Sequence, residues 1–177
     1  HIDQCIQYVT EGGTLDDSVA TIPDLIAARA SHLPQPVLEL CQTAAVFGYD
    51  VDRTVLTHAC ALGPRAFESN LSALIAHDLV RDADGIVTFT SPALRDIVYD
   101  STPGEVRRHL HGVAAELLAQ TTTEPALLGH HHDMAGATDP AADDLARAGD
   151  VATRYLDDAG ACALYQRALR AARAVLY

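Results

Sequence analysis

The sequence predicts a mainly α-helical protein that contains one β-hairpin. Over most of the chain, apolar residues recur at the three- and four-residue spacing of amphipathic helices. Residues 79–81 and 86–89 differ, because they are β-branched and apolar runs that flank the turn residues Asp84-Gly85. Three helical segments precede this hairpin and one follows it, which is the element order of a winged helix. Such a fold either reads DNA or serves as a packing module in a larger protein.

Two helical segments and a linker between them are expected before the first proline-rich break. Residues 2–9 have the pattern of a helix end, which Gly12-Gly13 terminates. Residues 14–21 are polar and are expected to form a linker. A helix is then expected over 22–32, ended by Pro34.

The helices around the hairpin are expected to supply the core of one module. One begins after Pro36 and ends at Gly48, and Asp52 is suited to cap the start of a short second helix. A third is expected over 65–78 and a fourth, after the hairpin, over 92–99. The side chains expected to face the core are Val37, Leu40, Cys41, Ala44, Ala45, Val55, Leu56, Ala59, Phe67, Leu71, Leu74 and Ile75.

Beyond Pro103 the chain is expected to be wholly helical. A helix over 105–120 is followed by one that holds His130–His132 and ends near Gly136. Segments 141–156 and 159–177 are expected to form an antiparallel pair, and such helical hairpins are the units of α-solenoids. The side chains expected to pack are Val106, Leu110, Val113, Leu117 and Leu118 in the first helix and Tyr155, Leu164, Tyr165 and Leu169 in the last pair. These last residues could line a concave peptide-binding surface, but we favour a plain core.

Composition and charge exclude several classes of function. The net charge of −12, with arginine as the basic residue at all twelve positions, disfavours binding to a nucleic-acid backbone. No run approaches the ~18 apolar residues of a membrane span, and no secretory signal is seen, so we expect a cytoplasmic protein. The cysteines are too far apart for a typical zinc site, and we expect buried, reduced thiols. They are Cys5, Cys41, Cys60 and Cys162.

No catalytic or metal-binding pattern is present in the sequence. The chain lacks a phosphate-binding loop of the G-x-x-x-x-G-K-[ST] type as well as the G-x-S-x-G and H-E-x-x-H motifs, so we do not expect it to be an enzyme. His130, His131 and His132 are candidate metal ligands. Consecutive helix residues point about 100° apart, however, so three in a row cannot converge on one ion. We expect one or two of them to pack at a helix interface instead.

The surfaces with which a winged helix contacts DNA are not basic here. A recognition helix and a wing generally carry Arg or Lys. In the third helix Arg65 is offset by Glu68 and Asp78. In the hairpin Arg81 is offset by acidic neighbours at 82 and 84. Direct DNA binding is therefore disfavoured.

A basic cluster begins the all-helical part of the chain. Arg107, Arg108, His109 and His111 could contact an acidic surface on a neighbouring domain. They could equally form a solvated face that Glu105 and Glu116 balance, which is the interpretation we favour because exposed ion pairs contribute little.

Several segments, in order, carry a family resemblance. Residues 22–29 (IPDLIAAR), 44–48 (AAVFG), 79–81 with 89–99, 107–111 (RRHLH), 127–131 (LLGHH) and 146–172 are similar to successive signatures of the STAND family of signal-transduction ATPases. This family includes large ATP-binding LuxR-type regulators and bacterial proteins linked to cyclases or kinases. The resemblance implies that residues 1–21 are a remnant of the ATPase lid, 22–101 a winged-helix module, and 103–177 the start of a tetratricopeptide-like repeat arm.

The resemblance also implies a function for the chain. It would be a regulatory segment of a multidomain ATPase and would contact that protein's own nucleotide-binding and effector domains. ATP or ADP would bind in the nucleotide-binding domain, with no cofactor in this segment, and the arm would take a protein or small-molecule inducer. Many relatives carry a basic-histidine pair directly after the wing phenylalanine, and in some of them a winged-helix histidine approaches the phosphate of the nucleotide. This chain has Thr90-Ser91 there, which disfavours direct nucleotide sensing and leaves Ser91 as a candidate for an interdomain contact. The alternatives are a DNA-binding transcription-factor module and a free-standing scaffold of helical repeats.

Overall fold

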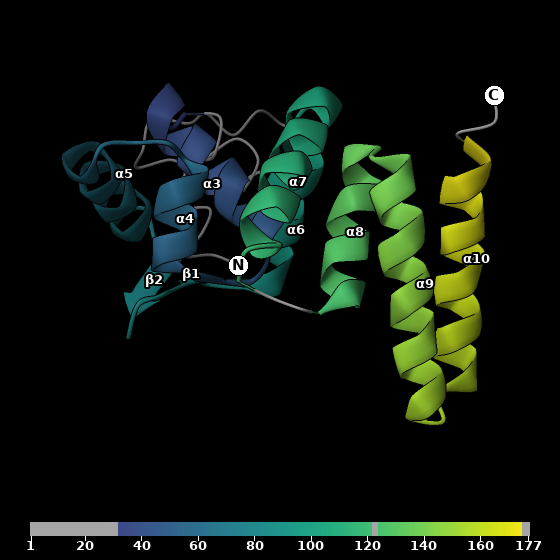
Figure 1. The fold of residues 1–177 in the computed structure, drawn as a ribbon. Coiled ribbons are helices and arrows are strands. Elements are labelled where there is room, and N and C mark those ends of the chain that lie inside the picture. Colours follow the sequence, from purple (N-terminus) through teal and green to yellow (C-terminus); the bar gives the residue numbers. More distant parts are fainter. Residues whose placement is uncertain (1–31, 122–123, 175–177) are drawn as a thin grey trace, which may run out of the picture. The chain divides into compact units, whose positions relative to one another are not determined.

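The computed structural model describes residues 32–121 and 124–174 (Figure 1). The protein is mainly helical with a small three-stranded antiparallel sheet. Its chain divides into an N-terminal unit, residues 1–103, and a C-terminal unit, residues 104–177. The elements expected before residue 32 lie outside the described residues. Among the helices that are described, none is both long and apolar enough to cross a membrane.

The N-terminal unit alternates helices with short strands. Its helices begin where the sequence provides caps or prolines. Pro64 and Pro92 each stand in the first turn of a helix, where the missing N–H costs nothing. The elements are α3 (Gln35–Phe47), β1 (Asp50–Asp52), α4 (Arg53–Ala59), α5 (Pro64–Ala76), β2 (Val80–Ala83), β3 (Ile86–Phe89) and α6 (Pro92–Ser101).

Asp52 caps helix α4 as the sequence predicts. One of its carboxylate oxygens accepts hydrogen bonds from the backbone N–H groups of Thr54 at 2.7 Å and Val55 at 3.1 Å. These bonds stabilise the ionised carboxylate and lower the pKa of Asp52, with the bond from Val55 as the largest cause. The cap fixes the point at which strand β1 turns into α4.

The hairpin is confirmed, but it belongs to a larger sheet than the sequence predicts. Strand β3 lies between β2 and β1, antiparallel to both, with Val80 opposite Phe89 and Val51 opposite Val87. At the turn, Asp84 and Gly85 both have positive φ, as a tight Asp-Gly hairpin requires. The expectation of a two-stranded ribbon is therefore wrong, because β1 adds a third strand.

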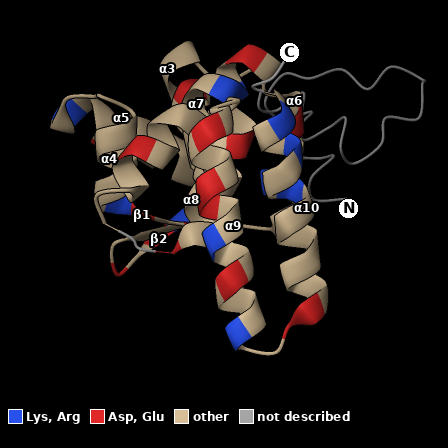
Figure 2. Ribbon diagram, turned by 45° about the vertical axis from the view of Figure 1, so that its right-hand side comes forward, with Lys and Arg blue, Asp and Glu red and all other residues tan. Residues whose placement is uncertain are grey.

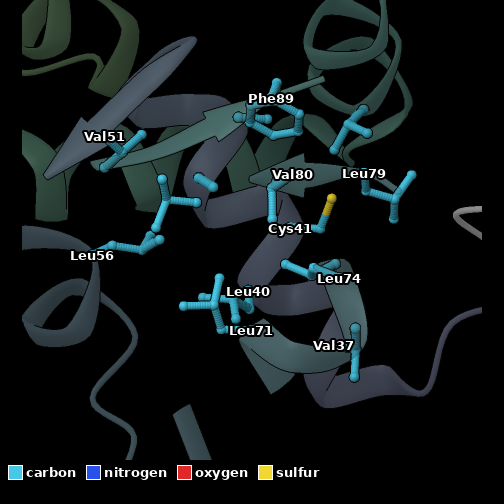
Figure 3. Packing of buried hydrophobic residues seen from close by; sticks show 14 of the residues in the cluster. Val37, Leu40, Cys41, Val51, Leu56, Leu71, Leu74, Leu79, Val80 and Phe89 are labelled. Carbon is cyan, nitrogen blue, oxygen red and sulfur yellow. The ribbon is translucent and has the colours of Figure 1, made fainter. Parts of the chain in front are cut away.

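The core of the N-terminal unit lies between the helices and the sheet (Figure 3). All five residues expected to face inward from α3 are buried, as is Leu56 of α4, whereas Val55 and Ala59 of α4 are half-buried. In α5, Phe67, Leu71 and Leu74 are buried, whereas Ile75 is 43% exposed. The prediction for Ile75 is wrong. It lies about 100° around the helix from Leu74, beyond the edge of the buried stripe.

The C-terminal unit consists of helices alone in its described part. They are α7 (Gly104–Leu118), α8 (Pro125–Ala135), α9 (Thr138–Arg154) and α10 (Asp158–Ala174). Gly136 ends α8 in the left-handed conformation, close to the predicted position. Helices α9 and α10 lie side by side and are joined by a short turn, as the sequence predicts (Figure 1).

Small residues form most of the interior of the C-terminal unit. Leu145 packs in a cluster with Ala141, Ala168 and Ala171. Alanine and glycine let helix axes approach closely. Tyr155, which we expected to pack, is 82% exposed, and Leu169 is 57% exposed. The packing prediction is wrong for these two residues.

Helix α7 buries a different face from the one predicted. Its buried residues are His111, Ala114 and Ala115. Val106 is exposed, and the other four predicted positions, Leu110, Val113, Leu117 and Leu118, are half-buried. The predicted stripe follows the most hydrophobic side chains, whereas the observed stripe is the one whose small residues allow close packing.

Candidate functional site

The surface formed by α5 and the hairpin is internally charge-balanced. The guanidinium of Arg53 on α4 contacts the carboxylate of Glu68 on α5 and, at 2.5 Å, that of Asp82 on β2. Both carboxylates raise the pKa of Arg53, the hydrogen bond to Glu68 most. Arg65 on α5 and Arg81 on β2 are exposed, and so are the acidic residues Glu68 on α5 and Asp84 in the hairpin turn. This surface therefore lacks the basic excess that phosphate contacts require.

We predict that the chain will not bind duplex DNA in a salt-sensitive manner. At low salt, a gel-shift titration is expected to leave a labelled duplex unretarded, because too few arginines are available to displace counterions. A basic winged-helix protein at the same concentration serves as the positive control. Retardation that weakens as salt is raised would overturn the prediction.

Ser91 acts locally at the start of α6. Its Oγ accepts a hydrogen bond from the backbone N–H of Leu94 at 3.1 Å. The neighbouring Thr90 hydroxyl donates to the carbonyl oxygen of Asp78 at 2.8 Å. Both side chains thus fix the connection between strand β3 and helix α6.

The four residues of the basic cluster at the start of α7 do not share one surface, because they differ in exposure. Arg108 and His109 are exposed, and Arg107 is half-buried. Arg108 and His109 line a shallow groove on the C-terminal unit together with Glu105 and Glu116. Acidic and basic side chains thus share one surface, which agrees with the balanced face favoured from the sequence.

His111 lies inside the C-terminal unit rather than on that surface. It is buried, and its Nδ1 lies 2.9 Å from Nδ1 of His131 on α8, which is also buried. One ring must donate and the other accept, so at least one Nδ1 carries no proton. The ring of His130 stands edge-on to that of His111, with 5.6 Å between ring centroids. The structure confirms that a histidine of the 130–132 run packs at a helix interface.

His132 points to a different helix from His131. Its Nδ1 lies 2.8 Å from a carboxylate oxygen of Asp144 on α9, and Arg147 binds the other oxygen of the same carboxylate. Asp144 is buried, so the hydrogen bond with His132 and the ion pair with Arg147 offset the cost of taking its carboxylate out of water. Within the described ranges, no group of three or more ligating side chains is arranged to hold a metal ion.

We predict that the paired histidines make the C-terminal unit sensitive to acid. Below about pH 5.5 both rings are mostly protonated in the unfolded chain. The folded hydrogen bond allows protons on no more than three of their four ring nitrogens. The unfolded state then binds more protons, so the free energy of unfolding falls as the pH falls, by at most ~1.4 kcal/mol per pH unit for one extra proton.

Urea unfolding at a series of pH values, followed by circular dichroism, measures this effect. The double variant His111→Leu, His131→Leu is expected to flatten the acid side of the profile. That variant leaves the nearby titratable groups, His130 and the His132–Asp144 pair, in place. His109→Asn, at an exposed position on α7, is the control and is expected to keep the wild-type profile. An identical slope in the double variant would contradict the prediction.

The cysteines differ in exposure more than the sequence predicts. Cys41 is buried, and burial raises the pKa of its thiol to about 12. Cys60 is partly buried, which raises its thiol pKa to about 11. Cys162 on α10 is exposed, contrary to prediction, and Cys5 lies outside the described residues. Among the described thiols, Cys162 is therefore the one best placed to react at neutral pH.

The comparisons with known proteins return nothing: no protein-family model, curated protein or solved structure matches the chain. A function for the chain therefore has to be inferred from its residues and their geometry. Two features bear on it: the charge-balanced surface of the N-terminal unit and the order of the family-like segments along the sequence.

Proposed function

We propose that the chain is a non-catalytic regulatory segment of a cytoplasmic, multidomain STAND-like signalling ATPase. In this proposal the N-terminal unit is a winged-helix module that holds or releases the nucleotide-binding domain. The C-terminal unit is a tetratricopeptide-like arm that receives a protein or small-molecule signal. ATP or ADP binds in the nucleotide-binding domain of the same protein. The whole protein acts in signal transduction or in the regulation of transcription.

The observation that carries the proposal is the contact of Arg53 with Glu68 and Asp82. These contacts join α4, the third helix α5 and the hairpin through paired charges. A surface used to read DNA presents such arginines to phosphates instead. The pairing supports a role in packing against another protein domain. The order of the family-like segments, which continues into the helical unit, supports the same role.

A co-purification experiment tests the proposal. The chain and the nucleotide-binding domain of the parent protein are produced separately, and retention is measured with ADP, with ATP and with neither nucleotide. We expect ADP to change retention, because the proposed module holds one nucleotide state of the ATPase in preference to the other. Equal retention, or none, under all three conditions would count against the proposal.

A pair of surface variants localises the contact. Arg108→Glu with His109→Glu makes the exposed surface at the start of α7, the candidate interdomain contact, strongly acidic. Arg154→Glu changes an exposed arginine on α9 and is the matched control. If the α7 cluster contacts the nucleotide-binding domain, the first variant weakens retention and the second does not. Equal effects would remove this cluster from the proposal.

A further inference from the structure

Helix α10 has an exposed face with little charge along most of its length. It packs against α9 through the opposite face, which carries Ala161, Ala168 and Ala171. Leu169 is 57% exposed, and Leu156, in the turn before the helix, is 88% exposed. Leu169 is the one large apolar side chain of this exposed face, and the residues before it there are small or uncharged, which lets a second helix approach closely. We call this surface the outer face of α10; its residues are Ala159, Cys162, Ala163, Gln166, Leu169, Arg170 and Arg173.

The charges at the two ends of this face have opposite signs. Asp158 stands in the first turn of α10, and Arg170 and Arg173 stand near its end. The stretch of the outer face between Asp158 and Arg170 carries no charged side chain. Figure 2 shows the acidic start and the basic end of α10. Two copies of such a helix, laid antiparallel, bring each acidic end against a basic end.

The outer surface of α9 differs from that of α10 and fits a solvated role. Asp139, Asp143 and Asp150 recur along it, together with Arg147 and Arg154. Charged side chains thus interrupt it throughout, as is usual for a helix face in water. The complementary ends and the uncharged middle belong to α10.

We propose that two copies of this chain associate through the outer face of α10, antiparallel and about a two-fold axis that passes between Cys162 and Gln166. In this register Asp158 of each copy lies opposite Arg170 of the other, and Leu169 lies opposite Ala159. Such an interface is isologous, with the same patch used twice. It does not depend on the function proposed above.

Charge reversal tests the register directly. Sedimentation velocity over a concentration series measures the dimer, and circular dichroism verifies that every variant is folded. Asp158→Arg and Arg170→Asp each place two like-charge pairs in the interface and are expected to raise the dimer Kd by about tenfold or more. Arg154→Asp, on the outer face of α9, is the matched control and is expected to leave the Kd unchanged.

Mixing the two single variants is the decisive measurement. In a heterodimer of Asp158→Arg with Arg170→Asp, both facing pairs are again of opposite charge, so the mixture is expected to regain the wild-type Kd. Within each variant alone, like charges still face each other. A mixture that associates no better than its components would overturn the antiparallel register.

Cross-linking provides a second, independent readout. Cys162 is exposed on the outer face and, in this register, lies opposite Gln166, so the two Cys162 thiols are within reach of a short bis-maleimide. Cross-linked dimer is expected for the wild type and not for Cys162→Ser. A wild-type chain that sediments as a monomer at every concentration, or a Cys162→Ser variant that cross-links as well as wild type, would overturn the proposal.

Discussion

Replacing Leu74 by alanine is expected to lower the free energy of unfolding of the N-terminal unit by about 2–5 kcal/mol. Leu74 is fully buried in α5 and belongs to the cluster that joins the helices to the sheet. Truncation removes its apolar contacts and leaves a cavity that the surrounding residues fill only in part. Urea unfolding followed by circular dichroism measures the loss, and amide hydrogen exchange assigns it to this unit.

The neighbouring Ile75 is the matched control for this prediction. It is also a branched apolar residue of α5, but it is 43% exposed. Ile75→Ala is expected to change the free energy of unfolding by within about 1 kcal/mol. Equal losses for the two variants would mean that the buried stripe of α5 includes Ile75 after all.

The second large effect is expected at Gly129, where an added methyl group has no space. A Cβ on Gly129 would lie 2.9 Å from Cγ of Leu145 and 3.0 Å from its backbone nitrogen. One of these close atoms is the backbone nitrogen of Leu145 in α9, so a change of the Leu145 rotamer does not relieve the contact. We expect Gly129→Ala to lower the stability of the C-terminal unit by about 1–3 kcal/mol, although alanine favours a helix over glycine by about 1 kcal/mol.

Gly112 on α7 supplies the opposite case within the same unit. A Cβ there meets its nearest neighbour, Cβ of Ala135, at 4.0 Å, an ordinary van der Waals contact. Gly112→Ala is therefore expected to stabilise the unit by about 0.5–1 kcal/mol through helix propensity alone. Thermal unfolding of the two variants and the wild type measures both changes in stability, the expected loss for Gly129→Ala and the expected gain for Gly112→Ala. A stabilised Gly129→Ala variant would contradict the close packing of α8 on α9.

The local features of the fold could be predicted from the sequence because they depend on neighbouring residues. Asp84-Gly85 has the conformational freedom that a tight hairpin needs, and the structure places the turn there. Asp52 and Gly136 likewise mark a helix start and a helix end where expected. Each of these signals operates over a few residues, so no tertiary contact is required to recognise it.

Strand β1 could not be predicted for a physical reason. It has three residues and one buried apolar side chain, Val51, so no alternating pattern can be recognised. What makes it a strand is its pairing with β3, more than thirty residues later in the chain. Pairing at that distance depends on the folded arrangement and leaves no local signal.

The candidate site shows the same limit. Arg108 and His109 are exposed, as a run of basic residues suggests, but His111 in the same run is buried against His131. The contact joins residues on two helices, and only the rotation of α7 relative to α8 determines it. The small residues Ala114 and Ala115 lie about one turn after His111, on the buried side of α7. They are the sequence signal from which burial of this face could be predicted.

The two units also differ in how far their contacts reach along the chain, with a consequence for the time course of folding. In the C-terminal unit the main contacts join consecutive helices, α7 with α8, α8 with α9, and α9 with α10. In the N-terminal unit β1 must pair with β3, and α3 must pack against α5 and α6, although these elements are far apart in the sequence. Closing long loops slows folding, whereas contacts between sequence neighbours form early. After dilution from denaturant, the helical unit should therefore acquire amide protection first, and the sheet-containing unit should set the slow phase.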